Sequence, residues 1–295
     1  MSQMPTALRG WRGTFTLMLT ITALLLSSLS MAGGHRAAKP KPNVKLDATQ
    51  RSDVTGTVLV TGANRGIGLA LATNYAKRGW TVYATARKPS KADTLNALAA
   101  DNPAVTVVTM DLLDHESIDE LAEQLKDVPI DVLFNNAAIL GDPALQELGN
   151  FDYDELMNVM AVNVAGTLKM VEAFTDHVAA SEQKKIVGMT SVQGSIGLLR
   201  DTSIPFYKMS KTALNMGMSS IALKLKRKGI TVALVSPGAV DTRMMNSALS
   251  HAGMKKANFL ITTEESAEKC INVVDQFKPE YTGLFMSHEG DILPW

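Results

Sequence analysis

The fold of this chain is decided by the stretch Thr57-Val58-Leu59-Val60-Thr61-Gly62-Ala63-Asn64-Arg65-Gly66-Ile67-Gly68. Its first five residues form a β-branched and apolar run, which is typical of a strand covered on both faces of a parallel sheet. An amphipathic stretch that ends near Arg78 predicts a helix directly after the glycines. Glycines between a strand and a helix N-terminus let the backbone approach a pyrophosphate, whose charge the helix end stabilises. In this context the loop predicts a dinucleotide site, with candidate residues Gly62, Asn64, Arg65, Gly66, Ile67 and Gly68.

The second predicted strand, from Thr81 to Thr85, ends without an acidic residue. A carboxylate at that point would bind the ribose 2′-hydroxyl of NAD, but here Ala86 is followed by Arg87. Arg65 in the glycine loop supplies another cation, and guanidinium groups bind phosphate through charge-assisted, often bidentate hydrogen bonds. We therefore expect NADP(H) to be preferred over NAD(H). The alternative is that both arginines are ordinary surface charges.

Short apolar runs alternate with amphipathic stretches along the rest of the chain. This order is typical of a doubly wound α/β fold, in which right-handed crossovers connect parallel strands. No internal repeat and no second core are evident, so we predict one Rossmann-type domain over residues 56–295. The predicted strands are 57–61, 81–85, 105–108, 130–134, 185–189, 230–235 and 284–286, and the longest predicted helix runs from about Tyr153 to Ala180.

Residues 1–32 form a hydrophobic leader. Arg9 and Arg12 precede an apolar run that begins at Phe15, and the small residues up to Ala32 suit a signal peptidase. The leader predicts a signal peptide or a membrane anchor, although the run is shorter than the ~20 apolar residues that span a bilayer comfortably. Translation from Met31 is a third alternative. Residues 33–55 are polar and rich in glycine, alanine, lysine and proline, and predict a linker.

The leader also bears on where the protein works. Reduced dinucleotide is scarce outside the cytoplasm, so we expect membrane association through Phe15–Ala32 with the catalytic domain facing the cytoplasm. Export to the periplasm after cleavage near Ala32 is the alternative. The 29 basic and 29 acidic residues give a formal net charge of zero, which speaks against a nucleic-acid partner because that would require a basic face. Cys270 is the single cysteine, so no intramolecular disulfide can form.

Tyr207 and Lys211 stand four residues apart in a helical pattern, which places both side chains on one helix face. A free tyrosine has a pKa near 10, and a neighbouring ammonium would lower that pKa toward the range useful for proton transfer. Ser191 follows the fifth predicted strand, at the sheet edge where open α/β folds bind ligands. It could hydrogen-bond a substrate oxygen or serve only the turn before Gly194. Asn163, in an apolar part of the longest helix, must find partners, in a structural role, a catalytic role or both.

These residues occur together and in an order that resembles the short-chain dehydrogenase/reductase family over about residues 56–295. The resemblance also includes the motifs Asp111-Leu112, Asn135-Asn136-Ala137-Ala138 and Ser236-Pro237-Gly238-Ala239-Val240-Asp241-Thr242. Each motif is common alone, and the set is specific. The resemblance implies reversible hydride transfer between NADPH and a carbonyl or alcohol, with no metal.

The resemblance also implies a role for each matching residue. Asn163, Ser191, Tyr207 and Lys211 would be the catalytic tetrad, in which Tyr207 exchanges its proton with the substrate oxygen. Ser191 would hold that oxygen, Lys211 would lower the tyrosine pKa and bind the nicotinamide ribose, and Asn163 would hold a water that links Lys211 to solvent. The remaining cofactor contacts implied are Asp111 and Leu112 at the adenine, Asn135 and Ala137 along the adenosine pocket, and Pro237, Gly238, Val240 and Thr242 at the nicotinamide.

Two departures from the family pattern are visible. Ala138 stands where the family usually has glycine, and the interval between Ser191 and Tyr207 is longer than usual, so residues 198–205 are expected to bulge over the site. The ending Gly283-Leu284-Phe285 with residues 291–295 resembles a subgroup that includes carbonyl reductases of the sniffer type and C-factor signalling proteins. A nucleotide-binding signalling protein with little turnover is therefore the alternative to an active reductase.

Two further expectations concern the outer parts of the domain. Residues 243–261, which include Met244, Met245, Met254 and Phe259, predict a mobile lid over an adaptable apolar pocket, or else plain core packing. The family resemblance implies a homodimer that forms through the long helices near Asn163 and Tyr207.

Overall fold

The structure is a computed structural model that describes residues 44–254 and 258–295. The predicted leader, residues 1–32, and the first part of the predicted linker lie outside the described residues. Within the described part of the chain, no helix combines the length and the apolar character needed to cross a membrane.

Seven parallel strands form one sheet in the order β3-β2-β1-β4-β5-β6-β7. This confirms the predicted doubly wound α/β fold, and each predicted strand is present within about two residues, the usual uncertainty of element ends. The strands are β1 Thr57–Val60, β2 Thr81–Ala86, β3 Val105–Thr109, β4 Val132–Asn135, β5 Lys185–Met189, β6 Thr231–Ser236 and β7 Phe285–Ser287. Strand order reverses between β1 and β4, and a sheet of this kind binds ligands at that point, beyond the carboxyl ends of its strands.

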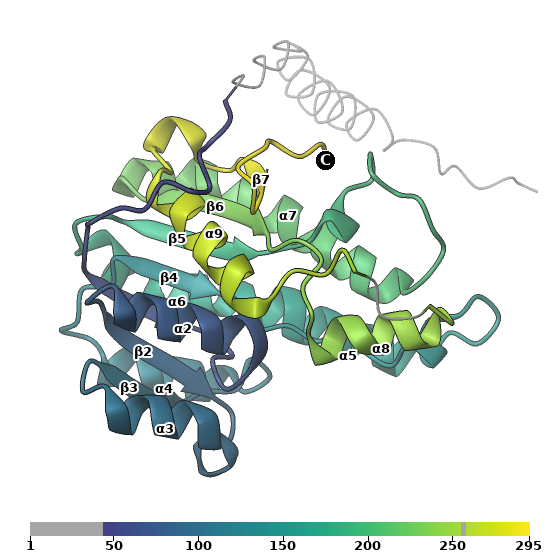
Figure 1. The fold of residues 1–295 in the computed structure, drawn as a ribbon, viewed down its shortest axis with the longest axis horizontal. Helices are drawn as coiled ribbons and strands as arrows, with labels where there is room; N and C mark the ends of the chain where they lie inside the picture. Colours follow the sequence, from purple (N-terminus) through teal and green to yellow (C-terminus); the bar gives the residue numbers. More distant parts are fainter. Residues whose placement is uncertain (1–43, 255–257) are drawn as a thin grey trace, which may run out of the picture. The chain divides into compact units, whose positions relative to one another are not determined.

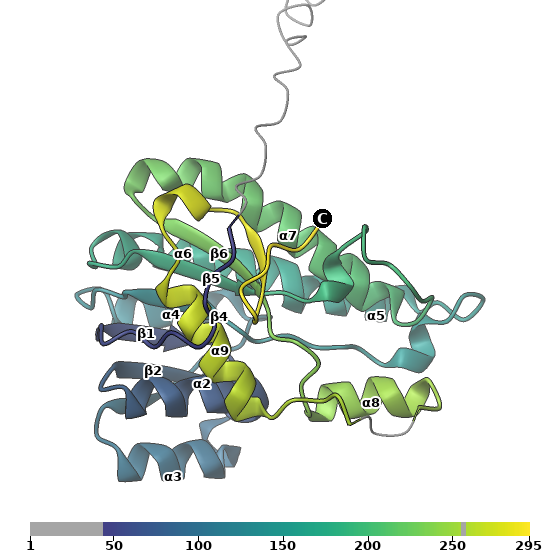
Figure 2. The ribbon, with the colours of Figure 1, turned by 45° about the horizontal axis from the view of Figure 1, so that its top comes forward.

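Helices cover both faces of the sheet (Figures 1 and 2). On one face lie α2 (Gly66–Lys77), α3 (Asp93–Asp101) and α9 (Thr263–Asp275), and on the other lie α4 (His115–Gln124), α6 (Thr167–Ala179) and α7 (Pro205–Leu225). The remaining helices are α5 (Tyr153–Met160), the π-helical segment η3 (Ala161–Gly166) and α8 (Arg243–His251). Short 3-10 turns occur at η1 (Pro89–Lys91), η2 (Pro143–Gln146), η4 (Val192–Gly194), η5 (Lys226–Lys228) and η6 (Pro279–Tyr281).

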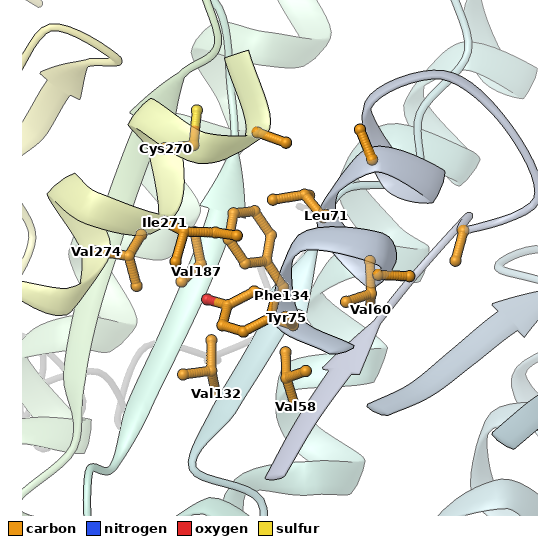
Figure 3. Packing of buried hydrophobic residues seen from close by; sticks show 14 of the residues in the cluster. Val58, Val60, Leu71, Tyr75, Val132, Phe134, Val187, Cys270, Ile271 and Val274 are labelled. Carbon is orange, nitrogen blue, oxygen red and sulfur yellow. The ribbon is translucent and has the colours of Figure 1, made fainter. Parts of the chain in front are cut away.

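The core has two layers because successive strand side chains point to opposite faces of the sheet. Val58 and Val60 of β1 pack in the layer under α2 and α9, where Tyr75 and Phe134 meet edge to face with ring centroids 6.4 Å apart (Figure 3). Leu59, between the two valines, points into the opposite layer under α4, α6 and α7. Consecutive apolar residues from Val58 to Val60 therefore fill both layers, as expected for a strand that is covered on both faces.

The described end of the predicted linker belongs to the folded domain. Leu46 and Ala48 are each only 6 % exposed, and the Leu46 amide donates to Gly290 O at 2.9 Å. Asn272 of α9 donates through Nδ2 to Ala48 O at 2.8 Å. Val44–Trp295 thus form one compact unit, which includes residues 44–55 of the predicted linker. The burial of Leu46 and Ala48 could not be predicted from this mostly polar stretch, because their partners lie more than 200 residues away in the sequence.

Candidate active site

The glycine loop is built where β1 and β4 separate. Thr61 Oγ1 accepts hydrogen bonds from the amides of Asn136 and Ala137, both at 3.0 Å, and Asn136 Nδ2 donates to Thr61 O at 2.9 Å. From the other neighbouring strand, Thr85 Oγ1 accepts from the Gly62 amide at 3.1 Å. These contacts hold the start of the loop in place before any ligand binds. Thr61, Thr85 and Asn136 were not among the predicted site residues.

The glycines of the loop fit a closely approaching phosphate group. A Cβ on Gly68 would lie 2.2 Å from Gly62 O, so this position accepts only glycine. Gly66 has a φ of +56°, which favours glycine, and a Cβ built there would make only an ordinary contact, with Thr242 Cγ2 at 3.9 Å. Arg65, at the start of α2, makes no side-chain cap, so the first amides of the helix can bind an anion. The predicted residues Asn64 and Ile67 lie in the same turn.

The predicted adenosine end lies along the carboxyl edge of β2, β3 and β4. Arg87 directly follows β2 and is exposed, as is Arg65. Asp111 follows β3 and accepts the Leu113 amide at 3.1 Å through Oδ1. Leu112 is buried, and a Cβ on Gly166 would lie 2.5 Å from Leu112 O. The structure therefore brings the predicted cations and Asp111 to one edge of the sheet.

Asn135 ends β4 and supplies a further sign of a ligand. The residue is 3 % exposed, and neither its Oδ1 nor its Nδ2 has a hydrogen-bond partner among the described residues. Buried polar groups are almost always paired, so a buried amide without a partner at the ligand-binding edge fits a group supplied from outside the chain. Ala137, two residues on, lies against Gly62, where an added Cβ would be 2.9 Å from the Ala137 Cβ.

Ser191, Tyr207 and Lys211 converge beyond the end of β5. Ser191 follows that strand, and its hydroxyl lies near enough to the Tyr207 hydroxyl from α7 to lower the pKa of that hydroxyl. Lys211, one turn further along α7, is 2 % exposed and places Nζ 5.7 Å from the centroid of the Tyr207 ring. Its Nζ donates to Met189 O at 2.9 Å, and an ammonium has two further protons to donate. The structure thus brings together three of the four predicted catalytic side chains.

The pKa values at this site differ from the sequence-based expectation. Burial raises the pKa of the Tyr207 hydroxyl to about 12, against a smaller lowering effect of the hydrogen bond with Ser191. Burial also lowers the pKa of Lys211 to about 8. We expected the Lys211 ammonium to lower the tyrosine pKa. In the protein alone the desolvation of both groups is the dominant effect, because protein atoms around the buried Lys211 and the half-buried Tyr207 disfavour their charged forms.

Asn163 lies in η3, the π-helical segment between α5 and α6, and is fully buried. Its Nδ2 donates to Ile139 O at 2.8 Å and to Ser210 Oγ at 3.0 Å, and its Oδ1 accepts from the Ile139 amide at 2.8 Å. Ser210 in turn donates to Tyr207 O at 2.7 Å. The amide therefore has the structural role considered from the sequence, in linking the segment after β4 to the helix of Tyr207. Its water-holding role stays a prediction.

Two residues that support Tyr207 were not identified from the sequence. Gln146 is 2 % exposed, and its Oε1 accepts the amides of Phe206 and Tyr207 at 3.0 and 3.2 Å, so that it caps the start of α7. Lys208 pairs with Asp201 Oδ1 at 2.6 Å. Neither residue belongs to a recognisable local motif, because each acts through a partner that only the folded chain brings near.

The predicted nicotinamide end is the loop after β6. Gly238 has a φ of +86°, and a Cβ there would lie 2.6 Å from the ring of His288. Pro237 O accepts from Ser266 Oγ at 2.8 Å, and Val240 is buried. Thr242 caps α8 by accepting the Met245 amide at 3.2 Å. Its approach to Gly66 places this loop beside the glycine loop.

The described part of the predicted lid consists of one helix and exposed apolar side chains beyond it, and its role as a lid stays a prediction. Residues 243–251 form α8, in which Leu249 is the one buried side chain. Met254 and Phe259 are 53 % and 63 % exposed, so the core-packing alternative does not apply to these two. Residues 255–257 lie outside the described residues.

A glycine loop at the switch point of a parallel sheet, joined to a serine–tyrosine–lysine set, defines a Rossmann-type oxidoreductase that uses a nicotinamide dinucleotide. The chain belongs to the short-chain dehydrogenase family, whose sequence model matches residues 56–253. This confirms the resemblance stated from the motifs.

Individual relatives agree with this assignment. The chain is 32 % identical over 246 residues to an uncharacterised oxidoreductase of Schizosaccharomyces pombe, a match that covers 80 % of this chain and 96 % of the relative. It resembles the carbonyl reductase Sniffer of D. melanogaster, with a TM-score of 0.73, 25 % identity, and coverage of 82 % of this chain and all of that one. The NADPH-bound carbonyl reductase from chicken fatty liver gives a TM-score of 0.74 at 27 % identity, with coverage of 81 % and 94 %.

Proposed function

We propose that this protein is an NADPH-dependent carbonyl reductase in which Tyr207 is the acid and base. The observation that carries the proposal is the contact between the Ser191 and Tyr207 hydroxyls beside buried Lys211, at the sheet edge that also holds the glycine loop. Its support from outside the chain is the similarity to carbonyl reductases, one of which has NADPH bound.

The proposed chemistry uses the site in the direction of reduction. A nicotinamide cofactor, when bound, supplies the hydride. Ser191 and Tyr207 hold the carbonyl oxygen, and Tyr207 delivers its proton to that oxygen as negative charge develops. With a pKa raised to about 12, the hydroxyl is protonated at neutral pH, as a proton donor must be. Lys211, with a pKa near 8, is the adjacent group that can return a proton to Tyr207.

The cofactor would lie between the glycine loop and the loop after β6. The first amides of α2 would bind the pyrophosphate, and Arg65 with Arg87 would bind a 2′-phosphate. Asn135 would direct its unpaired amide toward the adenosine part, and Lys211 would donate to the nicotinamide ribose. The proposed preference for NADPH over NADH is supported by the two exposed guanidinium groups and by the absence of a carboxylate directly after β2.

The test uses the full-length chain. NADPH and NADH are titrated by fluorescence, and aldehydes, ketones and quinones are then added while the loss of NADPH absorbance is followed. Tighter binding of NADPH than NADH, together with turnover, supports the proposal. Tight binding without turnover on any of these carbonyls would instead favour the nucleotide-binding signalling protein. Failure to bind either nucleotide would refute the assignment of the glycine loop.

A further inference from the structure

The segment between β5 and α7, residues 190–204, connects two parts of the proposed active site. It begins at the end of the strand that positions Ser191, and it leads into the helix that carries Tyr207. Three of its apolar side chains are exposed, at 40 % for Val192, 72 % for Ile196 and 55 % for Leu199. Exposed apolar side chains next to a site for a small organic substrate are candidates for contact with the apolar part of that substrate.

The first half of this segment is held by residues from the far end of the sequence. Ser195 Oγ donates to Pro294 O at 2.7 Å, and the Gly197 amide donates to Trp295 O at 2.8 Å. The same Ser195 hydroxyl accepts the Leu198 amide at 3.1 Å. A Cβ on Gly197 would lie 3.1 Å from Trp295 O, so the two backbones are in close contact. These hydrogen bonds therefore fix the backbone that carries the exposed side chains of Ile196 and Leu199.

Pro294 and Trp295 are themselves anchored to the core. Residues 291–295 return antiparallel to β7, with the Leu293 amide donating to Phe285 O and the Ser287 amide to Asp291 O, both at 2.8 Å. The Trp295 ring stacks on Phe285, with centroids 5.6 Å apart and planes at 29°, and Phe285 is only 1 % exposed. The chain of contacts thus runs from the buried sheet through Trp295 to the loop after Ser191.

The second half of the segment has a separate attachment. Lys208, which is buried, donates to Asp201 O at 2.8 Å and pairs with the Asp201 carboxylate. Between this attachment and Gly197 lie only residues 198–200, and Arg200 bonds within the segment, to Leu199 O at 2.8 Å. Loss of the Trp295 contact would therefore release the first half while the second half stays attached beside Tyr207.

We infer that Pro294 and Trp295 are positioning residues, which hold the Ser195–Leu198 turn so that Ile196 and Leu199 select the apolar part of the carbonyl substrate. The inference rests on the proposed function, and it adds a determinant of specificity outside the catalytic set. Pro294 and Trp295 act through the loop, so their effect is expected on substrate selection and not on NADPH binding.

The test compares full-length wild type with Trp295→Ala, Trp295→Phe and Ser195→Ala. Trp295→Phe keeps an aromatic ring that can stack on Phe285 and is the matched control. The first readout is hydrogen exchange in the peptide that covers residues 195–204. We expect exchange to rise about five-fold in Trp295→Ala and Ser195→Ala, because an aromatic pair or one hydrogen bond supplies stability of that size. In Trp295→Phe, residues 195–204 should exchange at the wild-type rate. The amides of the glycine loop should exchange at the wild-type rate in every variant.

The second readout is kinetic. For a bulky aromatic ketone, KM should rise about five-fold in Trp295→Ala, while kcat/KM for a small aldehyde and the Kd for NADPH change less than about two-fold. Unchanged exchange at residues 195–204 in both Trp295→Ala and Ser195→Ala overturns the positioning role. An equal loss for large and small carbonyls, or a parallel loss of NADPH affinity, overturns the role in selection. If wild type reduces no carbonyl, the proposed function fails, and hydrogen exchange still decides whether Trp295 positions the loop.

Discussion

Tyr207 is the residue on which the proposed chemistry depends. We expect Tyr207→Phe to abolish most turnover, because the ring remains while the proton donor is lost; general acid catalysis contributes a factor of about 10² to 10⁴. NADPH affinity should change little, since the hydroxyl lies beside Ser191 and in the proposed mechanism contacts the substrate oxygen. Steady-state kinetics and NADPH titration of the variant measure both quantities. Turnover equal to wild type would rule out Tyr207 as the acid.

We propose that Arg87 and Arg65 set the preference between the two nicotinamide cofactors. Arg87→Ala should weaken NADPH binding by a factor of about ten or more, because a hydrogen bond to a charged group contributes about 1.5–3 kcal/mol. NADH, which lacks the 2′-phosphate, should lose little. The ratio of the two dissociation constants, compared with that of the exposed control Lys88→Ala, is the measurement. Equal losses for NADPH and NADH would contradict the preference.

Asp275 introduces a pH dependence into stability, far from the active site. Its Oδ2 lies 3.4 Å from Arg78 Nη1, and Lys185 Nζ donates to Asp275 O at 2.8 Å. Burial nevertheless raises the pKa of this carboxyl to about 6, against the lowering effects of Lys185 and Arg78. A folded-state pKa above that of the unfolded chain means that the folded protein binds more protons between about pH 4 and 6.

The sign of this effect follows from proton linkage. The Asp275 contribution to stability is fully present below the unfolded pKa and is lost as pH rises through the folded pKa. Relative to Asp275→Asn, wild type should lose about 2 kcal/mol of unfolding free energy between roughly pH 4.5 and 7.5. Urea denaturation at the two pH values measures the difference, and the comparison cancels groups common to both chains. A constant difference across this range would mean that the carboxyl titrates normally.

Among the elements, the start of α7 is set by a side chain from another part of the chain. Gln146 accepts two amides of the first turn and donates through Nε2 to Leu140 O at 2.9 Å. Ile204, which precedes the helix, has a φ of 45°, a conformation that β-branched residues rarely adopt. The helix that carries Tyr207 therefore begins at a strained residue held by an external cap.

Gln146→Leu should lower the unfolding free energy by about 1–2 kcal/mol, as the loss of a cap does, and should lower kcat because Tyr207 is in the uncapped turn. Thermal denaturation and the separation of kcat from KM are the measurements. A loss of stability with kcat intact would limit Gln146 to a structural role.

The sequence predicted the elements well because their signals are local. The run from Thr57 to Thr61 is β-branched or apolar at every position, and Gly62, Gly66 and Gly68 mark the turn that follows. The cap of α7 was not predictable, because Gln146 is 60 residues from Phe206. The π-helical segment around Asn163 also escaped prediction, since a single extra residue in a helical turn leaves no periodic signal.

At the scale of the whole molecule, the outer face of α7 bears on assembly. Met209, Met216 and Leu223 are spaced seven residues apart and are 51 %, 72 % and 74 % exposed. Adjacent α5 adds Tyr153 and Met157, 69 % and 65 % exposed. Exposed apolar side chains gathered on one helix face are candidates for an interaction surface. These residues lie on the helices near Asn163 and Tyr207 through which the family resemblance predicts a homodimer.

We expect light scattering of the purified chain to give the mass of a dimer. The double variant Met216→Glu with Leu223→Glu should give a monomer, because four buried carboxylates would meet across a two-fold interface. Val54→Glu, at a similarly exposed apolar position away from α7, should remain a dimer. A monomer mass for wild type would contradict the predicted dimer but would leave the proposed chemistry unaffected.

The sequence by itself determined the sheet and the glycine loop, and it identified Ser191, Tyr207 and Lys211 as candidate catalytic residues. These depend on apolar period, on glycine stereochemistry and on residues close together in the chain. The tertiary structure alone decided that Leu46 and Ala48 belong to the core, that burial raises the Tyr207 pKa, and that Gln146 and Trp295 support the active-site segments. Each of these features depends on desolvation or on a contact between residues distant in sequence. A local sequence pattern predicts neither the desolvation of a side chain nor such a contact.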